Sequence, residues 1–236
     1  MRKISKVIQN TFSHFLYCIS PQPLHILDSS IVKSDYIGID LSTTNEELKH
    51  VDVSSSKKLE SYIDHHIKLN KAKVAFGGYL ETRAIYQRSD YFNDNKSNLA
   101  RNIHLGIDLW IAAETPIFAP LDAIVHSFNN NKNFGDYGPT IILEHKIKNI
   151  TFYTLYGHLS LSSIKTISIG QVFKKGELLA TLGSTSVNGD YPPHLHFQII
   201  KDIEHYVGDY PGVSTKRDLE FYNYNCPDPN MLLKLK

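Results

Sequence analysis

The sequence predicts a mainly β, antiparallel protein over most of its length after Lys73. Short runs rich in β-branched and aromatic residues alternate there with Gly, Pro, Asn and Asp, and few segments between them show helical periodicity. The runs expected to form strands cover residues 79–87, 123–125, 140–145, 150–156, 166–169, 177–182 and 194–200. Closely spaced strands without intervening helices favour antiparallel pairing over a parallel α/β sheet.

The segment before Lys73 follows a helical pattern instead. Apolar residues from Ile4 to Ile19 recur at three- and four-residue steps, which predicts an amphipathic helix that ends at Ser20-Pro21. A second helix is expected to begin near Ser54, because Leu59 and Ile63 have the spacing of one buried helix face.

This change of pattern divides the chain into three parts. We expect a helical N-terminal prefix over residues 1–73, a β domain over residues 74–201 and a loop-rich C-terminal extension over residues 202–236. The short amphipathic end of the extension is expected to dock on the core. A chain of 236 residues is long enough to bury a sizeable core.

Composition excludes several classes of protein. A net charge of +1 provides no broad basic field for binding a nucleic acid. No apolar run reaches the roughly 18 residues of a membrane span. Cys18 and Cys226 are too few for a disulfide framework. The basic start of the chain is not followed by a clean apolar block, so we expect no export signal and a cytoplasmic chain unless another export route exists.

The tripeptide His194-Leu195-His196 is the strongest functional signal. It lies in an apolar run after two prolines, which is typical of a strand, and residues two apart in a strand project from the same face. Two imidazoles on one buried face are costly to desolvate unless they bind something. Neutral imidazole is the commonest protein ligand of transition metals, so we predict a metal site here.

Further candidate ligands lie upstream. His104 and Asp108 are four residues apart, a spacing that places them on one face in either a helix or a strand. Together they offer a nitrogen and a carboxylate oxygen, a mixture that catalytic zinc sites use while leaving one position open for water. His158, at the end of the β-rich run from Ile150, is a candidate for proton transfer.

In these motifs the chain resembles the lysostaphin-type zinc metalloendopeptidases, which hydrolyse the peptides of bacterial peptidoglycan. The family's His-x-x-x-Asp motif is matched by His104 and Asp108, and its His-x-His motif by His194 and His196. Between them, the Tyr-Gly-His-Leu-Ser segment contains His158. The resemblance covers about residues 77–201, and the three motifs occur in the family's order.

The resemblance implies a fold and a set of roles. The fold would be an antiparallel two-sheet β-sandwich with a groove along one sheet. His104, Asp108 and His196 would bind one Zn²⁺ per chain, while His158 and His194 would be catalytic. The substrate would be a peptidoglycan stem or cross-link. The segment from Gly183 to Tyr191 is longer than is usual in the family, which changes the shape expected for the substrate pocket.

The mechanism and the substrate leave alternatives open. No glutamate lies beside a ligand histidine, so His158 or His194 would act as the base and the other as the acid or oxyanion stabiliser. No cell-wall-binding module is recognisable. A cytosolic zinc hydrolase of another peptide or amide is therefore a second hypothesis, and a non-catalytic binding or regulatory module is a third. Retention of both histidines speaks against the third.

Overall fold

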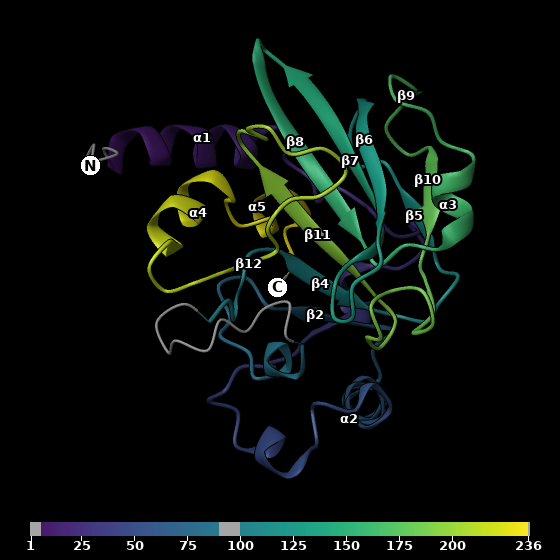
Figure 1. The fold of residues 1–236 in the computed structure, drawn as a ribbon. Coiled ribbons are helices and arrows are strands. Elements are labelled where there is room, and N and C mark those ends of the chain that lie inside the picture. The colour runs from purple at the N-terminus through teal and green to yellow at the C-terminus, as the bar shows by residue number, and fades with distance from the viewer. Residues whose placement is uncertain (1–5, 90–99, 236) are drawn as a thin grey trace.

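The computed structural model describes residues 6–89 and 100–235, and its main feature is an eight-stranded sheet (Figure 1). Its strands are β1 (Tyr36–Gly38), β2 (Val74–Gly77), β4 (Ile107–Trp110), β6 (Ala123–Asn131), β7 (Gly138–Ile147), β8 (Ile150–Gly157), β9 (Val172–Phe173) and β11 (His194–Ile200). They lie in the order β1-β2-β4-β11-β8-β7-β6-β9. Only β1 and β2 pair in parallel, so the prediction of a mainly β fold with antiparallel pairing is confirmed.

Two small sheets accompany the large one. Strand β5 (Pro116–Phe118) pairs with β10 (Leu178–Thr181), and β3 (Ile103–His104) pairs with β12 (Val213–Ser214). The described strands thus form one large and two two-stranded sheets, where the family resemblance implied a sandwich of two sheets. Strand β3 matters for function because it ends at His104.

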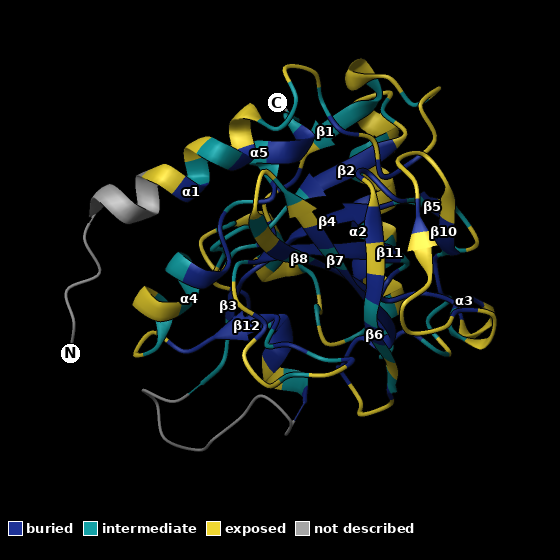
Figure 2. Ribbon diagram, turned by 90° about the horizontal axis from the view of Figure 1, so that it is seen from above, coloured by how far each residue is buried: buried dark blue, intermediate teal, exposed yellow. Residues whose placement is uncertain are grey.

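Strand β11 lies in the middle of the large sheet, and both of its faces are covered. Leu195, Phe197 and Ile199 point into the main hydrophobic core, whereas the alternate positions, beginning with His194 and His196, face the other side. All seven residues of the strand are buried, and the central strands are dark blue in Figure 2. The polar face of this strand is therefore enclosed by other parts of the chain.

The N-terminal region is only partly helical. It contains α1 (Lys6–Cys18), α2 (Ser56–Leu69) and the 3-10 turns η1 (Lys33–Asp35) and η2 (Glu47–His50), but its strand β1 also extends the large sheet. Phe12 and Leu16 of α1 pack into the main core. Ser55 caps the start of helix α2, because its hydroxyl accepts a hydrogen bond from the Lys58 backbone N–H. Residues 1–5, which include the start of the predicted first helix, lie outside the described residues.

Two predicted strands are wrong. Residues 79–87 form a turn followed by the 3-10 helix η3 (Ile85–Arg88), because positive φ angles at Gly78 and Leu80 bend the chain and turn Arg83 inward. Residues 166–169 are not a strand either, and the edge strand forms later, at β9. Helix α3 (Leu161–Lys165) ends just before residues 166–169. The hydroxyl of Ser160 caps this helix by accepting a hydrogen bond from the Ser163 N–H.

The C-terminal region adds two short helices, α4 (Leu219–Asn225) and α5 (Asn230–Leu233). Leu232 and Leu233 of α5 are buried in the main core, and the Leu232 carbonyl accepts a hydrogen bond from the Leu24 N–H. The two ends of the described chain thus pack on the same side of the sheet. Within the described residues, no helix has both the length and the apolar character needed to cross a membrane.

Candidate active site

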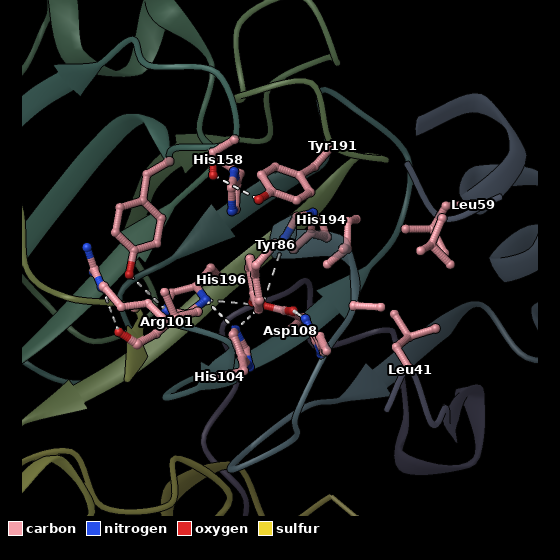
Figure 3. A pocket seen from close by; sticks show the side chains of 18 of the residues that line it. Leu41, Leu59, Tyr86, Arg101, His104, Asp108, His158, Tyr191, His194 and His196 are labelled. Atoms are coloured by element: carbon pink, nitrogen blue, oxygen red, sulfur yellow. Dashed lines mark hydrogen bonds and ion pairs between the residues drawn. The ribbon is translucent and has the colours of Figure 1, made fainter. Parts of the chain in front are cut away.

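Antiparallel pairing brings the five predicted site residues together. His196 on β11 lies directly opposite Asp108 on β4, and on the other side it lies opposite Gly157, the last residue of β8. His158 follows Gly157, so the end of β8 delivers it to the same place. His104 ends β3 and reaches the group from the edge. Figure 3 shows these side chains converging on one pocket.

Three of these residues place their ligand atoms together. His104 Nε2 lies 2.8 Å from His196 Nδ1, and each of these nitrogens lies 3.2 Å from Asp108 Oδ1. Ligand atoms of a tetrahedral zinc site are separated by about 3.3 Å, so this spacing fits one ion. All three residues are buried. The group is the His104, Asp108 and His196 set that the sequence predicted.

The hydrogen bonds behind the two histidines orient their lone pairs. His104 Nδ1 donates to the Gly78 carbonyl at 2.9 Å, which leaves Nε2 as an acceptor in the neutral ring. His196 Nε2 donates to Gln198 Oε1 at 2.9 Å, which leaves Nδ1 free. Burial lowers the pKa of His104 to about 4, so this ring is neutral at pH 7. Two lone pairs therefore face each other beside a carboxylate, an arrangement that fits a bound zinc ion.

Two glycines leave room for His104 and His196, the two candidate ligand histidines. A Cβ atom at Gly106 would lie 2.6 Å from His196 Cε1, and one at Gly78 would lie 2.8 Å from His104 Nδ1. A Cβ atom essentially never comes this close to a non-bonded heavy atom, so a side chain at either position would displace a candidate ligand. Gly78 also has φ +104°, a conformation that other residues rarely adopt.

His158 and His194 form a second pair beside the metal-binding group. Their ring centroids are 4.2 Å apart, and His194 Nε2 lies 3.8 Å from Asp108 Oδ1. His158 Nδ1 donates to the Asn188 carbonyl at 2.8 Å, and His194 Nδ1 donates to the Pro192 carbonyl at 2.7 Å. Each Nε2 is therefore an acceptor in the neutral ring. Burial lowers the pKa of both residues, well below the ordinary value for His158, so both are neutral at pH 7.

The long segment from Gly183 to Tyr191 positions this second pair. It supplies the Asn188 carbonyl that orients His158, and the Tyr191 ring packs 5.1 Å from His158 and 5.8 Å from His194. His158 itself has φ +63°, a strained backbone conformation for a residue with a side chain. The unusual segment is thus part of the site.

Sequence reasoning missed three residues that support the site. Arg83 Nη1 lies 2.6 Å from Asp108 Oδ2, and Arg83 Nε lies 2.5 Å from Glu81 Oε2. Gln198 orients His196, and the Tyr137 hydroxyl lies 3.4 Å from His196 Nε2. Gln198 could have been found, because it shares a strand face with both histidines. Arg83 could not, because its segment was interpreted as a strand.

Arg83 leaves only one oxygen of Asp108 for the metal-binding group. Replacing Arg83 with methionine is expected to weaken zinc affinity about 10- to 100-fold, because partners behind a ligand have effects of that size. Competition with a chelator measures the affinity. Arg217→Met, which removes a surface pair with Asp218, is the matched control and should change nothing. If Arg83→Met lowers only the stability of the metal-free protein, Arg83 does not orient Asp108.

One cavity of about 390 Å³ contains all five site residues. Its walls come from distant parts of the chain, including residues of the 41–59 segment on one side and Tyr210 to Val213 on another. Arg101, Tyr137 and Tyr191 also line the cavity, and the Tyr137 ring lies 5.0 Å from that of His196. A volume of this size is typical of sites for small ligands or short peptide segments.

Comparison with known proteins shows that the segment containing this site is similar to a peptidase family. The description "Peptidase family M23" matches residues 102–207, which include all five site residues. A Haemophilus influenzae protein named "Uncharacterized metalloprotease" is 35% identical over 40% of this chain and 18% of its own length. The Vibrio cholerae "Peptidoglycan DD-endopeptidase ShyC" is 34% identical over 41% of this chain and 20% of its own.

A solved structure, the catalytic domain of the antimicrobial peptidase lysostaphin from Staphylococcus simulans, aligns with 22% identity. The alignment covers 52% of this chain and 80% of that one, with a TM-score of 0.36. The chain spans only about a fifth of the length of the two curated relatives named above. The family match and the enclosed His-Asp-His group agree, and residues 102–207 of the chain are similar to peptidase family M23.

Proposed function

We propose that this chain is a zinc-dependent endopeptidase that hydrolyses peptide bonds of bacterial peptidoglycan. The observation that carries the proposal is the placement of two neutral histidines, each with a free Nε2, in the same cavity as the three ligand atoms. The name of the Vibrio cholerae relative, a peptidoglycan endopeptidase, supports the substrate. His104 Nε2, Asp108 Oδ1 and His196 Nδ1 would hold the ion.

When bound, zinc supplies a Lewis acid that polarises the scissile carbonyl and lowers the pKa of water toward neutrality. The chain's own residues handle the protons. We assign the proton of the attacking water to His194, because its Nε2 lies 3.8 Å from a ligand oxygen and that carboxylate stabilises the protonated ring. His158 is next to it, and its Nε2 carries no proton at the start. We therefore assign His158 the relay of the proton that His194 has taken from the water to the leaving amine nitrogen as the C–N bond breaks.

The three-part division of the chain also enters the proposal. We assign catalysis to a zinc peptidase domain over residues 74–201, with residues 1–73 as an N-terminal addition and residues 202–236 as a C-terminal one. Two observations support a functional role for these two additions. Strand β1 joins the sheet of the peptidase domain, and residues of both additions line the cavity that contains the site histidines.

Incubation with purified peptidoglycan sacculi, and separately with a set of unrelated peptides, tests the substrate. We expect the zinc-loaded protein to produce new amino termini in the sacculi, detected by mass spectrometry, and His194→Ala to produce almost none. Cleavage of the unrelated peptides alone would replace peptidoglycan with another peptide or amide substrate. No cleavage by folded, zinc-loaded protein would favour a binding or regulatory role.

A further inference from the structure

The cavity continues beyond the catalytic histidines along an aliphatic surface. We define this surface as the apolar wall, which consists of Leu41, Leu48, Val53, Leu59 and Ile85. All five residues lie outside the segment that matches the peptidase family, residues 102–207. The apolar wall thus comes from parts of this chain that precede the family segment.

Trp110 connects the apolar wall to the catalytic group. Its ring stacks on His194 at 5.8 Å, and it belongs to the same buried apolar cluster as Leu41 and Leu59. An aliphatic surface therefore begins beside a residue that we place in the proton transfer. In Figure 3, Leu41 and Leu59 lie on one side of the metal-binding group and Arg101 lies on the other. Arg101 thus lies across the metal-binding group from the apolar wall, and Ser42, Thr43 and Asn45 line the cavity beside that wall.

The apolar wall combines fixed and accessible side chains. Leu41, Leu59 and Ile85 are buried, whereas Leu48 and Val53 are only half-buried and border the cavity. Aliphatic side chains around a cavity of about 390 Å³ favour an apolar group that leaves water on binding. A charged or hydroxylated side chain that contacts the apolar wall itself would lose hydration there, because these five side chains offer it no hydrogen-bond partner.

We propose that the apolar wall is a specificity subsite that binds an aliphatic side chain of the substrate residue next to the scissile bond. This inference rests on the proposed peptidase function and adds a substrate preference to it. The N-terminal addition would then select the substrate, while the family segment cleaves it. The occupant is one side chain of an extended peptide, and the other half of the peptide extends toward Arg101.

The single tryptophan of the chain makes the subsite measurable without catalysis. Trp110 is the only tryptophan and it lines the cavity, so intrinsic fluorescence reports occupancy directly. We would titrate zinc-loaded His158→Ala protein, which cleaves slowly, with two capped tetrapeptides that differ only in Leu or Ser at one position. The Leu peptide is expected to bind roughly 10-fold more tightly, as complementary apolar pockets discriminate by about 10- to 200-fold per group.

Variants of the apolar wall decide whether it causes the preference. Leu48→Asp should reduce the preference for the Leu peptide to less than about threefold, since the carboxylate disfavours apolar burial. Val53→Asp, at another half-buried position, provides a second variant if Leu48→Asp does not fold. Leu178→Asp is the matched control, because Leu178 is 58% exposed and does not line the cavity. It should keep the full preference.

Equal binding of the Leu and Ser peptides, or a preference that survives both Leu48→Asp and Val53→Asp, would overturn the subsite. Neither result depends on hydrolysis. If these variants lose the preference for the Leu peptide, but the wild type does not cleave sacculi, only the proposed function would be overturned. Cleavage of sacculi together with equal peptide binding would overturn only the subsite.

Discussion

Asp108→Ala protein is expected to be purified almost free of zinc, whereas the wild type carries about one ion per chain. Asp108 Oδ1 lies 3.2 Å from both ligand nitrogens and supplies the only negative charge among the three ligand groups. Its removal also leaves Arg83, which is 5% exposed, as a buried cation next to two histidines. Both effects disfavour a dication, and elemental analysis measures the outcome.

The matched control for this variant is Asp122→Ala. Asp122 is exposed and pairs with Lys174 on the surface, so its loss should leave the zinc content unchanged. Circular dichroism of the metal-free proteins separates loss of a ligand from loss of the fold. Undiminished zinc in folded Asp108→Ala protein would contradict the assignment of this ligand.

His158→Ala and His194→Ala are expected to keep their zinc and lose about 10²- to 10⁴-fold in the rate of hydrolysis. Each residue donates its Nδ1–H to a backbone carbonyl and keeps Nε2 for proton transfer, and neither belongs to the group of three ligand atoms. Cleavage rates at saturating substrate, together with zinc content, test both roles. If either variant loses its zinc, the histidine that it replaces has been assigned the wrong role.

His145→Ala provides the control for removal of a buried histidine. His145 is fully buried but lies outside the cavity, where Nδ1 donates to the Asp122 carbonyl and Nε2 accepts from Thr154 at 2.7 Å. Its removal should lower thermal stability, because it leaves a cavity and unpaired polar atoms in the core. Zinc content and activity per folded molecule should persist.

The alternation of residues, the spacing of motifs and their resemblance to a known family let the sequence predict the candidate site residues before the fold is known. Residues 194 and 196 face one side of a strand because the side-chain period of a strand is two, and this requires no long-range contact. Residues 104 and 108 are compatible with one face in either regular conformation. The mainly β fold follows from the same local signal, repeated along the chain.

Local signals failed where distant contacts outweigh them. The segment from Tyr79 to Gln87 is apolar enough for a strand, yet it turns because the Arg83 guanidinium is held between Glu81 and Asp108, and Asp108 is 25 residues away. The same holds for ring orientation. The lone pairs of His158 are aimed by the carbonyl of Asn188, 30 residues later in the chain.

The sequence by itself predicted which side chains form the candidate site, because residue type and local period select one strand face and the order of the motifs resembles that of a known family. Only the tertiary structure decided which nitrogen of each histidine is free, since that depends on the carbonyl behind each ring. It also decided that residues from the N-terminal region border the site. In the apolar wall, Leu41 and Leu59 pack in one cluster with Trp110, although each is separated from it by roughly fifty or more residues in the sequence. Contacts between such distant residues have no periodic signature in a sequence.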